Sequence, residues 1–205
     1  NEDNEDNVVN DEIINNDEID NLFNKLPPIE KDSKKKSNIL RDEEIIEENE
    51  IKWIPKKRGD KIHDLSVFAG NTKTDGKVYI GKIDKSPGKV NIDKNKIWNY
   101  WIQNIGSSES GKMLVVNCKY EWQNIQRGKK IPENAVYCGK DESNDDVWVG
   151  KSYDNEAGKI NCTYKDENTD EPIMHNFWCH GSYCSSQKAY ILVVFNGKKT
   201  YLTEY

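Results

Sequence analysis

Short runs of alternating hydrophobic and polar residues occupy the chain from Trp53 onward. These runs are rich in Val, Ile, Tyr and Trp and are separated by Gly, Asp, Asn and Ser, a pattern typical of all-β proteins. The runs predicted as strands are 65–69, 77–83, 113–116, 134–138, 146–152 and 189–195. Asn196-Gly197 predicts a type I′ turn, because that turn needs two residues that tolerate positive φ. We therefore expect a closing hairpin between 191–195 and 200–203.

Residues 1–50 have a different composition. They are poor in aromatic residues and rich in Asn, Asp, Glu and Lys, as in chains that bury too little apolar surface to offset the entropy of ordering. We expect an acidic, largely disordered tail. One apolar stripe has the spacing of one face of a short helix: Ile19, Leu22, Phe23 and Leu26. Such a stripe docks on a partner or on the chain's own domain, or it is a chance cluster. The acidic segment 42–50, with Ile45 and Ile46, is also compatible with a helix.

Charge is divided unevenly between this tail and the rest of the chain. Positions 1–50 hold 17 acidic and 6 basic residues, which leaves 19 acidic and 24 basic residues for positions 51–205. The difference predicts that the tail folds over the body or engages a basic partner. Lysines are scattered among acidic residues and no nucleic-acid-binding motif occurs, which argues against nucleic acid. No run of 18 apolar residues is present, which argues against a membrane span.

An internal repeat appears when the chain is compared with itself at a shift of 69 residues. The matches include Trp53 with Trp122, Arg58-Gly59 with Arg127-Gly128, Gly70 with Gly139, Gly81-Lys82 with Gly150-Lys151, and, after a one-residue insertion near Glu156, Gly88-Lys89 with Gly158-Lys159. The match predicts repeats over 51–117 and 118–195. Each is too short to bury a sheet face alone, so we expect them to interlock into one pseudo-two-fold domain over 51–205, with a closing strand in 196–205.

The repeated motifs resemble a known family. Pro132-Glu-Asn-Ala135, Val147-Trp-Val149-Gly150-Lys151 and Ala157-Gly158-Lys159 in the second repeat, and Ala69-Gly70, Val78-Tyr79-Ile80-Gly81-Lys82 and Pro87-Gly88-Lys89 in the first, are similar to the DM-nine repeat. The resemblance covers residues 51–195. It implies two interlaced β repeats and a mannose-binding lectin. The His-Tyr-Glu-Val-Leu end of the family's repeat is absent, with Met113-Leu-Val-Val116 and Ile191-Leu-Val-Val194 in its place.

The resemblance also implies the sugar-binding residues. In the family, an Asp after Ala-Gly and the Lys of Pro-Gly-Lys bind the sugar, and these positions correspond to Asp141 and Lys159 in the second repeat. The first repeat keeps Lys89 but has Thr72 in place of the Asp, which predicts a weakened site because a hydroxyl lacks the charge-assisted bonds of a carboxylate. Trp148 and Tyr153 either supply an aromatic face for the sugar or, for Trp148, belong to the core.

Five cysteines leave at least one unpaired in the chain. Cys138, Cys162 and Cys179 align with apolar residues of the first repeat, so we expect buried, reduced thiols. Such thiols favour a reducing compartment and a cytoplasmic location, whereas an N-terminal signal that has been removed would imply secretion or a lumenal location. The cluster His175, Cys179, His180 and Cys184 lacks the spacing of common zinc sites, so no metal site is predicted.

Two classes of function follow from these observations. The first is a non-enzymatic, mannose-type carbohydrate-binding module. The second is a protein-interaction or scaffold subunit with decayed sugar sites, in which residues 1–50 dock on a partner; a homodimer also fits. No nucleophile, phosphate-loop or metalloprotease motif occurs, so neither an enzyme nor a cofactor is predicted.

Overall fold

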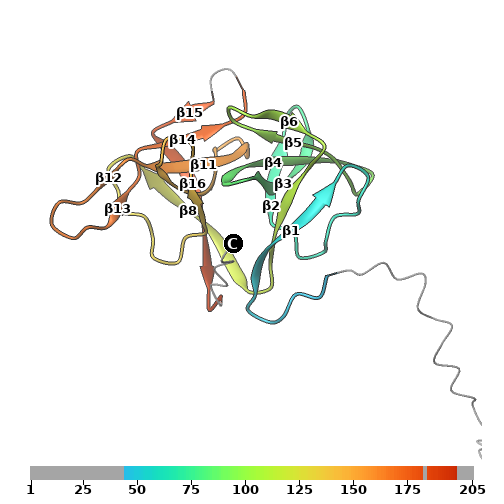
Figure 1. Cartoon of the computed structure of the whole chain (residues 1–205), viewed down its shortest axis with the longest axis horizontal. Helices are drawn as coiled ribbons and strands as arrows, with labels where there is room; N and C mark the ends of the chain where they lie inside the picture. The colour runs from blue at the N-terminus through green and yellow to red at the C-terminus, as the bar shows by residue number, and fades with distance from the viewer. Residues whose placement is uncertain (1–43, 182–183, 198–205) are drawn as a thin grey trace, which may run out of the picture. The chain divides into compact units, whose positions relative to one another are not determined.

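The computed structural model describes residues 44–181 and 184–197, and these residues form an all-β domain, which confirms the predicted fold class (Figure 1). The first sheet contains β1 (Ile51–Lys57), β2 (Phe68–Thr72), β3 (Gly76–Ile83), β4 (Ser86–Asp93), β5 (Lys96–Ile102), β6 (Gly106–Ser108) and β7 (Ser110–Val116). The second contains β8 (Lys119–Gln126), β9 (Tyr137–Lys140), β10 (Asp146–Lys151), β11 (Ala157–Cys162), β14 (Asn176–Cys179), β15 (Ser185–Ser186) and β16 (Lys188–Phe195). A separate ribbon pairs β12 (Tyr164–Lys165) with β13 (Pro172–Ile173).

The two sheets have the same topology. The strand order is β1-β7-β3-β4-β5-β6 in the first and β8-β16-β10-β11-β14-β15 in the second, with β2 and β9 added to β3 and β10. Residues matched by the shift of 69 occupy equivalent places. Trp53 is paired with Leu114 and lies beneath the Lys82 ammonium at 5.0 Å, and Trp122 is paired with Leu192 and lies 4.9 Å from the Lys151 ammonium.

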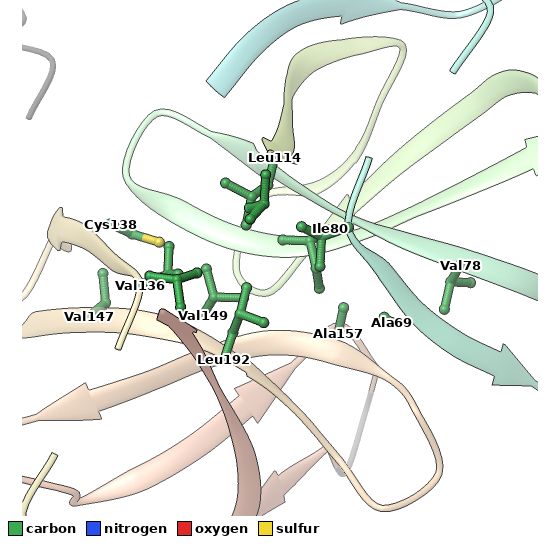
Figure 2. Close-up of a cluster of buried hydrophobic side chains, with 13 residues drawn as sticks. Ala69, Val78, Ile80, Leu114, Val136, Cys138, Val147, Val149, Ala157 and Leu192 are labelled. Atoms are coloured by element: carbon green, nitrogen blue, oxygen red, sulfur yellow. The ribbon is translucent and has the colours of Figure 1, made fainter. Parts of the chain in front are cut away.

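Apolar side chains from both sheets form a shared core (Figure 2). Ile80 and Leu114 of the first sheet meet Val149 and Leu192 of the second, and all four are fully buried. Burial of each such side chain stabilises the fold by about 1.5–3 kcal/mol. Burial of apolar side chains between the two sheets therefore holds them together. One repeat alone has no second sheet against which to bury these side chains.

The folded part begins before the boundary predicted at Ile51. Ile46 is 8% exposed and packs in the core of the first sheet, and its carbonyl accepts a hydrogen bond of 3.0 Å from Asn117 Nδ2. Glu44 forms an ion pair with Lys52. The predicted boundary is thus too far along the chain, and residues 44–50 form no helix. The stripe from Ile19 to Leu26 and the closing strand 200–203 lie outside the described residues.

The predicted strands correspond to β2, β3, β7, β9, β10 and β16, with ends displaced by up to three residues at β2, β7 and β9. β4 and β11 were not predicted, because Pro87-Gly88 and Ala157-Gly158 are typical of turns rather than strands. Both strands instead lie in the interior of their sheets. This location brings the Gly-Lys motifs to the centre of the domain.

Candidate functional site

Lys89 of β4 and Lys159 of β11 occupy equivalent positions in the two sheets. Each residue is only 7% exposed. Lys89 is paired with Trp101 of β5, and Lys159 with Trp178 of β14. Directly paired residues project from the same face of a sheet, so each lysine leaves its sheet on the same face as a tryptophan. We call these groups the Lys89 site and the Lys159 site.

The glycine before each lysine allows the tryptophan strand to approach closely. A Cβ at Gly88 would lie 2.5 Å from the Trp101 carbonyl oxygen, and one at Gly158 would collide with the Trp178 carbonyl. The ring positions are then fixed by hydrogen bonds to asparagines of the lysine strands: Trp101 Nε1 donates to Asn91 Oδ1 at 3.2 Å, and Trp178 Nε1 to Asn161 Oδ1 at 3.1 Å. The glycine of each Gly-Lys motif thus lets the lysine strand pack closely against a strand that carries a fixed indole.

The Lys159 site joins the two residues that the family resemblance implied. Lys159 Nζ donates to Asp141 Oδ2 at 2.7 Å, and the Asp141 carboxylate also accepts the backbone N–H groups of Ser143 and Asp145 at 2.9 and 3.2 Å. Burial raises the pKa of Asp141, but the bond from Lys159 and the backbone donors outweigh burial, so its pKa lies below the usual range. The carboxylate is therefore ionised at neutral pH and rigidly oriented.

The Lys89 site contains two carboxylates, so the substitution at Thr72 does not leave its lysine without one. Lys89 Nζ donates to Asp75 Oδ2 at 2.6 Å and to Glu156 Oε2 at 2.7 Å. Thr72 Oγ1 accepts the N–H of Asp75 at 3.1 Å and so holds the turn that presents Asp75. Burial lowers the pKa of Lys89, but these two carboxylates outweigh it and the net pKa is raised. Sequence matching missed Asp75 because the carboxylate has moved three positions along the loop.

Glu156 reaches the Lys89 site from the second sheet. It lies between β10 and β11, and the equivalent position in the first repeat is Ser86, the first residue of β4, which is buried and uncharged. The Lys89 site therefore combines two carboxylates with one ammonium, whereas the Lys159 site combines one of each. No sequence pattern indicates this difference, because the position of Glu156 depends on how the two sheets meet.

The two tryptophans differ in what lies against them. The imidazole of His180 packs on Trp101 with ring centroids 4.9 Å apart. Trp178 instead lines a cleft of about 480 Å³, together with Gln103, Asn104 and residues of the β14–β15 connection. The aromatic residues proposed from the sequence are elsewhere: Trp148 is 7% exposed within the core of the second sheet, and Tyr153 packs edge-on against Tyr190.

The prediction that Cys179 is a reduced thiol is wrong. Cys179 forms a disulfide with Cys184, because the chain reverses at Gly181 (φ 130°) and brings the two Cα atoms to 5.1 Å. Cys138 and Cys162 are buried free thiols, as expected.

The two histidines of the cluster have different partners: His175 contacts Thr163 at 2.8 Å, whereas His180 packs on Trp101. Among the described residues, no group of three or more His, Cys, Asp or Glu side chains is arranged to hold a metal.

The remaining sequence-based site residues fall in the undescribed tail, namely Ile19, Leu22, Phe23 and Leu26. Within 44–181 and 184–197, no helix is long and apolar enough to span a membrane.

Comparison with known proteins adds no assignment to these observations: no protein-family model matches the chain, and no curated protein shows significant sequence similarity to it.

Proposed function

We propose that this domain binds carbohydrate, without catalysing a reaction, at the Lys159 site. The observation that supports this function is the arrangement of Lys159 and Trp178 on paired strands, with Asp141 of the β9–β10 connection bonded to Lys159. Sugar hydroxyls both donate and accept hydrogen bonds, so a neighbouring carboxylate and ammonium suit a pair of adjacent hydroxyls. An indole ring suits the apolar C–H face of the same sugar.

The Lys159 site is the better of the two candidates. An ammonium has three N–H donors, and among the described residues Asp141 is the hydrogen-bond partner of Lys159, so donor capacity is left for a ligand. Lys89 already bonds two carboxylates, and His180 covers part of Trp101. The resemblance to DM-nine lectins, whose equivalent Asp and Lys bind mannose, supports a mannose-type ligand.

Calorimetry with methyl α-mannopyranoside tests this proposal on the full chain. We expect Asp141→Asn to weaken binding at least about tenfold, since a charge-assisted hydrogen bond contributes roughly 1.5–3 kcal/mol. Lys159→Met should have a similar effect, and Lys89→Met, at the equivalent position, should leave the affinity within about twofold. Unchanged binding by Asp141→Asn, or no binding by the wild type, would overturn the assignment.

A protein-interaction or scaffold function is the second candidate. The side chains of Lys159 and Asp141 are only 9% and 6% exposed, which favours a structural ion pair over a ligand site. The excess of acidic residues in positions 1–50 then favours a basic partner for the tail. A chain shortened to residues 44–205 distinguishes the two functions, because it should keep sugar binding and lose association with such a partner.

A further inference from the structure

A cleft of about 480 Å³ lies where the ends of the two sheets meet, beside the Lys159 site. The β5–β6 connection contributes Gln103 and Asn104, and the second sheet contributes Trp178, His180 and Ser185. β5 and β6 of the first sheet and β15 of the second lie in the upper part of the domain in Figure 1. The Cys179–Cys184 disulfide joins two residues that line the cleft, so this side of the cleft is covalently restrained.

Gln103, which lines this cleft, carries a hydrogen-bond acceptor that is not used within the described part of the protein. Its Oε1 atom is buried and accepts no hydrogen bond from the described residues. Buried polar atoms in folded proteins nearly always have a partner, because an unpaired one has lost its bond to water. A ligand that donates an O–H or N–H group to Gln103 would restore the missing bond.

The lining of the cleft selects for a neutral, hydroxyl-rich ligand. Within the described residues the lining holds no Asp, Glu, Lys or Arg, so a charged ligand would meet no counter-charge. Gln103, Asn104 and Ser185 instead present amide and hydroxyl groups around the Trp178 indole. Few polar groups around an aromatic wall are typical of small-ligand sites, and the volume lies in the usual range of about 300–1,000 Å³.

We propose that this cleft binds the second sugar unit of an oligosaccharide whose first unit occupies the Lys159 site, an inference that rests on the proposed function. Trp178 belongs to both places, since it is paired with Lys159 and also lines the cleft. A glycan held at Lys159 therefore meets the cleft at its next unit. The ligand class is then a neutral oligosaccharide rather than a single hexose.

The difference between the two sheets supports extension from Lys159. Gln103 follows Trp101 by two positions, and His180 follows Trp178 by two positions, so these residues are equivalent. His180 packs on Trp101, which places an imidazole against the indole of the Lys89 site. Gln103 and Trp178 instead line the open cleft. The second repeat thus has room for an extended ligand where the first has a ring contact.

Calorimetry on the full chain with an α-linked mannobiose and with methyl α-mannopyranoside tests the inference. The wild type should bind the disaccharide roughly tenfold more tightly, the effect of one or two added hydrogen bonds. Gln103→Met, which keeps the side-chain length, should remove most of this gain and leave the affinity for the monosaccharide unchanged. Gln126→Met, on the exposed side of β8, is the matched control and should keep the gain.

The outcomes separate this inference from the proposed function. If the wild type binds both sugars equally, or Gln103→Met keeps the full gain, the cleft is not a subsite, although the Lys159 site still binds sugar. If the wild type binds neither sugar, both proposals fail. Retained monosaccharide affinity in Gln103→Met shows that the variant is folded, and Asn104→Ala, an exposed change in the same lining, provides a second test with a smaller expected loss.

Discussion

The ammonium of Lys89 lies 2.7 Å from the carboxylate of Glu156, although the two residues belong to different sheets. A second polar bond also crosses between the sheets, because Lys151 Nζ donates to the Ala69 carbonyl at 2.6 Å. The shared core brings the sheets together, and these bonds fix which loops meet. Groups from both repeats therefore contribute to the Lys89 site and to the cleft.

Glu156→Gln should destabilise the domain by about 1 kcal/mol. The Lys89 and Glu156 side chains are 9% and 22% exposed, so the pair lies between a solvent-exposed and a fully buried ion pair, and Asp75 still partners Lys89 in the variant. Urea unfolding measures the change. Glu167→Gln, at an exposed position of the β12–β13 loop, is the control and should be within about 0.5 kcal/mol of the wild type. Equal stabilities of the two variants would show that the pair contributes nothing.

Asp141 should make stability dependent on pH in the acid range. Its pKa in the folded protein lies below the unfolded value of about 3.9, so the folded state gains stability above that value and loses it as pH falls through the folded pKa. The gap in melting temperature between wild type and Asp141→Asn should therefore be largest near neutral pH and shrink below pH of about 4. Asp154→Asn, at an exposed position, is the control and should show only a small gap. A constant gap for Asp141→Asn would contradict the ion pair.

The all-β fold and three of the charged residues of the candidate sites, Lys89, Lys159 and Asp141, could be predicted from the sequence. Alternation of apolar and polar residues identifies strands such as β3 and β10, because each buries one row of side chains against the other sheet. Repetition of Gly-Lys identified Lys89 and Lys159, which the structure places at equivalent positions. These equivalent positions correspond to residues matched in the internal repeat of the sequence.

The rest of the site depends on contacts that no local pattern records. Glu156 lies next to Lys89 only because the two sheets pack together, and Gln103 lines the cleft for the same reason. Cys179 aligns with Ile102, which suggested a buried thiol, yet the reversal at Gly181 brings Cys184 to it. Burial was predicted correctly for Cys179, and its bonding state was not.

Ile46 should be required for full stability although it precedes the repeat. Ile46 is 8% exposed and its neighbour Ile45 is 86% exposed, which makes them a matched pair. We expect Ile46→Ala to cost about 2–4 kcal/mol through lost burial and the cavity left in the first sheet, and Ile45→Ala to cost less than about 0.5 kcal/mol. Thermal or urea unfolding measures both. A chain beginning at residue 44 should have the same stability as the full chain, whereas a chain beginning at residue 51 should be as unstable as Ile46→Ala. If the chain beginning at residue 51 is as stable as the full chain, Ile46 does not contribute to the core.

The five cysteines should fall into three classes when they are alkylated and the intact mass is measured. The denatured, unreduced protein should take up three adducts, at Cys118, Cys138 and Cys162, because the disulfide protects Cys179 and Cys184. After reduction it should take up five. In the native protein Cys118, which is half-buried, should react first, because burial raises the pKa of both Cys138 and Cys162 to about 12 and blocks access to them.

Loss of the disulfide should destabilise the domain by about 2 kcal/mol, the value expected for closing a loop of this length. Cys184→Ser tests this, and it leaves Cys179 as a buried thiol at the end of β14. Cys118→Ser is the control, since that cysteine is a free thiol outside the loop, and it should change stability by less than about 0.5 kcal/mol. Because the disulfide restrains one wall of the cleft, Cys184→Ser should also weaken disaccharide binding more than monosaccharide binding. Five adducts in the unreduced protein, with no loss of stability in Cys184→Ser, would show that Cys179 and Cys184 are not bonded.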